Sequence, residues 1–101
     1  MRVDKEGYLL ELADWNQTVA TELALREGLT LTPEHWAVIE LLRDFHHTTG
    51  VSLSMRPLVK LVGKHLGSDK GTSIHLLSLF PGSPAKLAAK LAGLPRPTNC
   101  L

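Results

Sequence analysis

Cysteine is nearly absent from this sequence of 101 residues: the chain has one, Cys100. A single thiol cannot form a disulfide within the chain, nor a zinc site built from several cysteines. An apolar run of the roughly 20 residues that a membrane helix requires is also missing, and acidic residues interrupt the N-terminus before a signal-peptide core could form. We therefore expect a cytoplasmic protein that uses no metal or other cofactor and has no membrane partner.

The sequence also lacks an excess of one charge. It has 11 Lys and Arg against 10 Asp and Glu, for a formal net charge of +1. Such a balance gives no strong field toward nucleic acid or membrane, so we expect direct nucleic-acid binding to be weak or absent. Hydrophobic residues make up 44% of the chain, enough for one packed core. This predicts a single domain over residues 1–101.

Helix start and stop signals predict an all-α fold, small α+β at most, of about five short helices. Asp14 with Gln17 is interpreted as the N-cap of the first helix, and Pro33 and Pro84 as first helical residues. The predicted helices lie over 15–27, from Pro33 to near Gly50, between Ser54 and Gly67, over 72–80, and from Pro84 to Gly93. The preceding turn at 4–7 predicts a small N-terminal β-hairpin.

The last eight residues, 94–101, cannot continue the final helix because Pro95 and Pro97 remove backbone donors. We expect a mobile, extended C-terminal arm that can carry the Cys100 thiol into the site of another molecule. Arg96 could lower the pKa of this thiol if the arm folds back. The plainer interpretation is that Cys100 is an incidental small hydrophobic residue held by Leu101. The position near the chain end favours a reactive thiol.

Five short blocks carry a resemblance to a known family: TPEHW at 32–36, LRD at 42–44, LFP at 79–81, AGLP at 92–95 and PTNCL at 97–101. In this order and spacing they resemble the DsrC/TusE family over nearly the whole chain. The resemblance implies a hairpin followed by an orthogonal helical bundle, with sulfur carried as a persulfide on the penultimate cysteine, here Cys100. The sulfite-reductase partners of this family have a second cysteine eleven residues earlier, where this chain has Ala89. The chain therefore most resembles the single-cysteine TusE branch.

The resemblance also implies a function and partners. It predicts a sulfur carrier, of the sulfurtransferase type, that passes sulfur on for tRNA 2-thiouridine synthesis through a catalytic Cys100. Its donor would be a TusBCD-like complex, and its acceptor a tRNA thiouridylase with bound tRNA. Whether such a carrier counts as an enzyme stays open at this point.

A few other residues are candidates for binding the arm or its sulfur. Arg43 and Arg56 could hold the carboxylate of Leu101 or a persulfide anion, because a guanidinium offers paired donors in a fixed fork. The alternative for both is a solvated charge on a helix. His35 could line the groove that receives the arm, although a core or surface histidine is the simpler interpretation. None of the five histidines has the spacing of a metal ligand set.

Two other functions compete with sulfur transfer. The third and fourth predicted helices have the spacing of a helix-turn-helix, and a modest basic face could bind nucleic acid. The near-neutral charge weakens this alternative. The other is a gamma-type subunit of a sulfite reductase system without a redox role, since Ala89 removes the second thiol.

Overall fold

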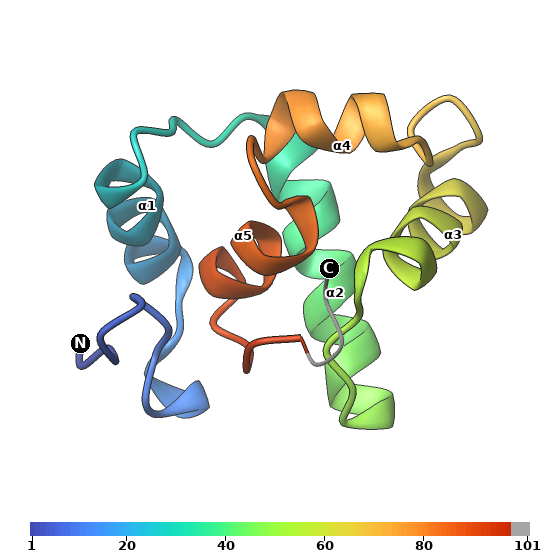
Figure 1. Ribbon diagram of the computed structural model, residues 1–101. Helices are drawn as coiled ribbons and strands as arrows, with labels where there is room; N and C mark the ends of the chain where they lie inside the picture. Colours follow the sequence, from blue (N-terminus) through green and yellow to red (C-terminus); the bar gives the residue numbers. More distant parts are fainter. Residues whose placement is uncertain (98–101) are drawn as a thin grey trace.

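The computed structural model describes residues 1–97, which form five α-helices and one short 3-10 helix (Figure 1). In chain order they are η1 (Leu12–Asp14), α1 (Gln17–Arg26), α2 (Pro33–Thr49), α3 (Met55–Leu66), α4 (Ser73–Leu79) and α5 (Pro84–Leu91). The predicted all-α class is confirmed. Within this range no helix is long and apolar enough to cross a bilayer.

The helix boundaries follow the predicted signals except at α1. Pro33 and Pro84 are first helical residues, and Gly50 caps α2 in the left-handed conformation at φ 73°. For α1 the predicted N-cap Asp14 is wrong: Asp14 ends η1, and the cap is Asn16, whose side chain accepts from the Val19 N–H at 2.8 Å. Two candidate capping residues stand two positions apart, and only Asn16 has the extended backbone that precedes this helix.

The N-terminal hairpin is not formed as a pair of strands. One isolated antiparallel bridge joins Val3 and Leu9, and no strand occurs in residues 1–97. The Asp4 carboxylate accepts the N–H groups of Glu6 at 2.8 Å and Tyr8 at 3.0 Å. The Tyr8 N–H therefore does not donate to the Asp4 carbonyl, and the pairing is limited to two backbone bonds, from the Asp4 N–H to the Tyr8 carbonyl at 2.8 Å and from the Leu10 N–H to the Arg2 carbonyl at 3.0 Å.

Helix α5 is the central element of the core. It packs against α1, α2, α3 and α4, and Figure 1 shows it between α1 and α2. Its small residues let these neighbours approach closely, while larger side chains fill the space around it. The buried residues of α5 are Pro84, Ala85, Leu87, Ala88, Ala89 and Leu91, and the largest fully buried side chains include Phe80, Leu23, Ile39, Leu58 and Leu76.

The turn between α3 and α4 depends on two glycines in contact. A Cβ on Gly71 would overlap the backbone of Gly63, whereas a Cβ on Gly63 would meet the Gly71 Cα at an ordinary 3.5 Å. Gly63 lies inside α3, where glycine is a weak helix former. The turn is therefore packed backbone to backbone, with room for a side chain on one side only.

This asymmetry predicts opposite effects for two alanine substitutions. Gly71→Ala should destabilise the fold by about 1–3 kcal/mol, because the added methyl overpacks the backbone. Gly63→Ala should be neutral or stabilising by up to about 1 kcal/mol, since alanine is the better helix former. Urea unfolding of the two variants beside the parent chain measures the difference. Equal loss of stability in both would show that the two glycines do not pack as described.

Candidate functional site

The predicted catalytic residue Cys100, together with Leu101, lies outside the described residues 1–97. What the structure does describe is the base of the tail, where α5 ends and residues 92–97 continue toward the cysteine. The residues that hold this base therefore determine from which part of the domain the tail departs.

Two side chains from distant parts of the chain bind the C-terminal end of α5. The indole N–H of Trp15 donates to the Leu91 carbonyl at 2.9 Å, and Arg43 Nη1 donates to the Ala92 carbonyl at 2.7 Å. The guanidinium carbon of Arg43 also lies 3.8 Å from the centroid of the Trp15 ring. The last carbonyls of a helix have no partner inside the helix, so these two donors satisfy groups that would otherwise need water. We call Trp15 and Arg43 the α5 clamp.

The backbone after the α5 clamp turns sharply at Gly93. Its φ is +71°, and the N–H groups of Gly93 and Leu94 donate back to the carbonyls of Lys90 at 3.1 Å and Ala89 at 2.9 Å. This pair of bonds is the Schellman ending of a helix. A Cβ on Gly93 would overlap the Trp15 side chain. Glycine is therefore required here by the backbone conformation and by the close approach of the indole.

Burial changes the electrostatics of the α5 clamp. Desolvation lowers the pKa of Arg43 from its ordinary value, while the nearby Asp44 acts in the opposite direction. An arginine stays charged in proteins, so the clamp is a fixed cation beside the end of α5. That position suits a cation, since the C-terminal end of a helix carries partial negative charge. The predicted contact of Arg43 with Leu101 or a persulfide stays a prediction.

Two of the first four residues of the predicted arm are buried against the domain, while Pro95 and Arg96 are exposed. Leu94 is only 4% exposed and Pro97 is buried. Arg96 forms an ion pair with Glu6, and its guanidinium carbon lies 5.5 Å from the centroid of the Tyr8 ring. The arm therefore begins with a docked segment in this structure, although its mobility in solution stays a prediction.

The docked segment and the N-terminal turn support one another. Burial raises the pKa of the Asp4 carboxyl, but hydrogen bonds from the Tyr8 and Glu6 N–H groups and the charge of Arg96 outweigh it, so the net pKa lies below its ordinary value. Lys90 also lies near Tyr8: its ammonium bonds to Glu27 at 3.2 Å and lies 5.3 Å from the centroid of the Tyr8 ring. A hollow of about 390 Å³ opens beside these groups, lined by Glu6, Tyr8, Glu27, Ser83, Lys86 and Lys90 among others.

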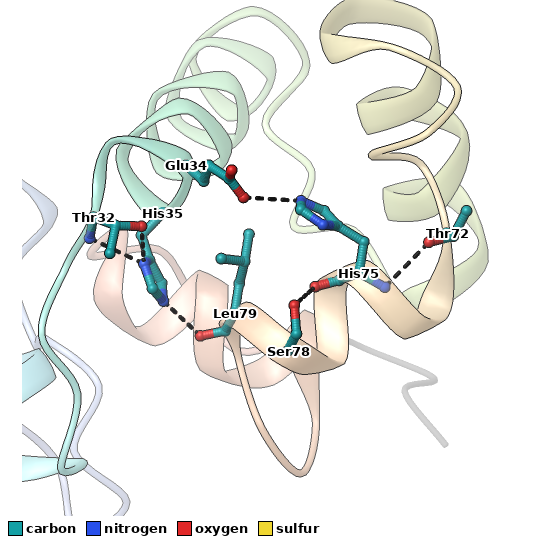
Figure 2. Close-up of polar contacts among 7 residues, drawn as sticks. All are labelled: Thr32, Glu34, His35, Thr72, His75, Ser78 and Leu79. Atoms are coloured by element: carbon teal, nitrogen blue, oxygen red, sulfur yellow. Dashed lines mark hydrogen bonds and ion pairs between the residues drawn. The ribbon is translucent and has the colours of Figure 1, made fainter.

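His35 occupies a structural position and does not join the α5 clamp. It is 6% exposed, its Nδ1 accepts the Thr32 N–H at 3.0 Å, and its Nε2 contacts the Leu79 carbonyl at 2.7 Å (Figure 2). The first contact requires an unprotonated Nδ1 and the second a donor at Nε2, so the tautomer is fixed. Both ring nitrogens are engaged in joining the start of α2 to the end of α4. These contacts support the alternative of a core histidine over a contact with the arm.

The remaining predicted residues are not brought together. Arg56 is exposed in the first turn of α3, and the structure records no hydrogen bond or ion pair between it and any part of residues 1–97. Among these described residues no group of three or more His, Asp or Glu could hold a metal ion. Trp15 was missed by the sequence reasoning, because its partner carbonyl is 76 residues away and no local pattern pairs them.

Comparisons by family model, by sequence and by structure all match this chain to DsrC or TusE proteins. The protein-family model described as DsrC like protein matches residues 1–101. The "Sulfurtransferase TusE homolog" of Haemophilus influenzae is 48% identical over 101 residues, which are all of this chain and 93% of that protein. The NMR structure of Allochromatium vinosum DsrC has a TM-score of 0.90 at 48% identity and covers 98% of this chain and 88% of its own. The oxidized DsrC gamma subunit of the dissimilatory sulfite reductase from Archaeoglobus fulgidus has a TM-score of 0.86 at 38% identity. The match covers 99% of this chain and 91% of that one.

The α5 clamp predicts different effects for the two candidate arginines. Arg43→Lys should destabilise the chain by about 1–2 kcal/mol, because lysine cannot both stack flat on Trp15 and keep the bond to Ala92. Amide hydrogen exchange at Gly93 and Leu94 should accelerate with it. Arg56→Lys is the matched control and should change stability by less than about 0.5 kcal/mol. Unchanged exchange at Gly93 and Leu94 in Arg43→Lys would contradict a role for this residue in holding the tail base.

Proposed function

The chain belongs to the DsrC-like protein family, and on this basis we propose that it is a sulfur carrier that accepts persulfide sulfur on Cys100. The observation that carries the proposal is the single cysteine next to the chain end, in a chain 48% identical to a protein named as a sulfurtransferase. The thiolate is the one side chain here whose chemistry suits the uptake and release of sulfur. Sulfur transfer through a covalent intermediate on Cys100 follows.

The transfer is a pair of thiol exchange steps with no net change in oxidation state. The Cys100 thiolate attacks the terminal sulfur of a donor persulfide, a new S–S bond forms, and the donor leaves as a thiolate. In the second step an acceptor thiolate attacks the terminal sulfur of the Cys100 persulfide. Cys100 then leaves as a thiolate and is ready for another cycle. No electron donor is consumed, which is consistent with a chain that has no second thiol.

We further propose the partners that the family resemblance implies. The donor would be a TusBCD-like complex, and the acceptor a tRNA thiouridylase that holds tRNA and converts a uridine to 2-thiouridine. In this scheme the carrier needs contact with two proteins and no strong contact with tRNA itself. A formal net charge of +1 supports this division, since nucleic-acid binding usually relies on a clear excess of Lys and Arg.

The domain would contribute by fixing the base of the tail. Trp15 and Arg43 hold the end of α5, and Arg96 pairs with Glu6, so residues 92–97 have a defined course over the body. A fixed base limits the conformations that a thiol near the chain end can adopt, which reduces the entropy lost when it enters a partner's site. The described residues thus support a carrier in which the domain holds the base of the tail and Cys100 carries the sulfur.

A second candidate is a gamma-type subunit of a sulfite reductase system. The likeness to the gamma subunit from Archaeoglobus fulgidus favours it. Such a subunit would have no redox role, because the position where the resemblance places a second cysteine is Ala89, whose side chain is 2% exposed within α5. A chain with one thiol cannot form an internal disulfide, so a redox role of that type is excluded for it alone.

Incubation with a cysteine desulfurase and a TusBCD-like donor should add the mass of one sulfur atom to the protein, measured by intact mass spectrometry. Cys100→Ser should abolish the adduct and leave the circular dichroism spectrum and unfolding midpoint unchanged. Addition of a tRNA thiouridylase with tRNA should discharge the loaded protein and produce 2-thiouridine.

The outcomes separate the two candidates. Sulfur uptake by Cys100→Ser would sink the carrier proposal. Loading of Cys100 without discharge to the thiouridylase, together with stable binding to a sulfite reductase, would favour the gamma-type subunit.

A further inference from the structure

Helices α2 and α3 contact one another, and α3 lies beside α2 in Figure 1. Side chains from both helices line two neighbouring hollows on the surface. One has a volume of about 330 Å³ and the other about 240 Å³, and both are lined by Phe45 from α2 and Leu61 from α3. Leu41 adds to the apolar floor of the first hollow, and Leu53 and Pro57 to that of the second. We call the two together the α2–α3 groove. The floor of the groove consists of apolar side chains, and Phe45 and Leu61 belong to both hollows.

The edge of the α2–α3 groove is basic along α3. Lys60 and Lys64 line the second hollow, His65 lines the first, and Arg56 stands one turn before Lys60 on the same helix. The α3 sequence contains no Asp or Glu. Arg56, Lys60 and Lys64 are exposed, and none of them has an ion pair with any residue in the range 1–97.

Four other cations of residues 1–97 are engaged, whereas Arg2, Lys5, Lys70 and Lys86 form no ion pair within that range either. What sets α3 apart is that its three cations lie along one helix that has no acidic residue. Arg26, Lys90 and Arg96 each pair with a glutamate, and Arg43 bonds to the end of α5. The unpaired cations of α3 therefore leave a positive edge beside an apolar floor. This combination is the complement of an amphipathic segment with acidic residues flanking its apolar face.

We propose that the α2–α3 groove is a docking site for an acidic amphipathic helix of a partner protein. Lys60 and Lys64 are one helical turn apart, about 6 Å along the axis, so carboxylates at positions i and i+4 of a bound helix can face both. Apolar side chains of the same helix would cover Phe45 and Leu61. The docking goes beyond sulfur transfer, because it does not involve Cys100.

A nucleic acid is a poorer fit to the same surface. Phosphate contacts need cations along the path of the backbone, whereas the floor of the α2–α3 groove is apolar and Asp44 lies in the lining of its first hollow. A peptide helix gains from burying apolar surface and tolerates a single carboxylate at the edge. The charges and the floor together favour a protein partner.

The probe for this proposal is a synthetic helical peptide with leucines on one face and glutamates flanking them at i and i+4. Its control is the same peptide with each glutamate replaced by glutamine. Titration of the full-length, isotope-labelled chain, followed by NMR, should shift the amides of residues lining the α2–α3 groove. Binding of the glutamate peptide should be several times tighter than that of the control and should weaken as salt is raised.

Charge variants of the chain make the test specific. Lys60→Glu and Lys64→Glu should each weaken binding of the acidic peptide about twofold to fivefold or more, whereas Lys5→Glu, the same charge change on the exposed N-terminal turn, should not. Cys100→Ser should bind as the parent does, so this result is independent of sulfur loading.

Several results would overturn the docking proposal. These are equal affinity for the glutamate and glutamine peptides, shifts outside the α2–α3 groove, and binding that Lys60→Glu and Lys64→Glu leave unchanged. Absence of binding at millimolar peptide would do the same. Binding of tRNA, with the acidic peptide inactive, that both lysine variants reduce would assign the surface to nucleic acid instead.

Discussion

The course of the C-terminal tail depends on how the last carbonyl groups of α5 are satisfied. A helix that ends inside a protein leaves carbonyls that must find donors, and here the indole of Trp15 and the guanidinium of Arg43 supply them. The two donors also stack on one another, and Gly93 makes the room for the indole against the backbone. Segments before α1, in α2 and after α5 thus meet at one point. The central helix and the exit of the tail are fixed by the same contacts.

In the proposed carrier a fixed tail base would limit the approaches open to the thiol, and thiol exchange requires a defined approach of one sulfur to another. The docked residues 94–97 extend the ordered region toward the cysteine, with Leu94 in the core and Arg96 paired to Glu6. His35 gives similar support elsewhere in the core, because its contact with the Leu79 carbonyl joins the start of α2 to the end of α4. Trp15, Arg43 and Arg96 therefore hold the base of the tail, and His35 holds the framework beneath it.

Local signals were sufficient for much of the fold. Pro33, Pro84 and Gly50 mark helix ends through backbone constraints that act on their own residues, so they could be interpreted from the sequence. The reduction of the expected hairpin to a single bridge could not be predicted, since the Asp4 side chain takes the Tyr8 N–H that a longer ladder would use. The α5 clamp could not either, because Trp15 and Leu91 are brought together by the packing of α1 against α5. Arg43 was found as a candidate through the chemistry of its guanidinium, but its partner in the described structure is a backbone carbonyl.

We propose that Cys100 carries sulfur between proteins on a tail whose base is fixed by the α5 clamp. The most direct measurement is the rate at which Cys100 gains sulfur from a persulfidated protein donor, compared with the rate from a small-molecule persulfide, in Arg43→Lys and in the control Arg56→Lys. Arg43→Lys should slow transfer from the protein donor severalfold and leave the small-molecule reaction unchanged, while Arg56→Lys should change neither rate. Equal rates from the protein donor in both variants would contradict the proposal.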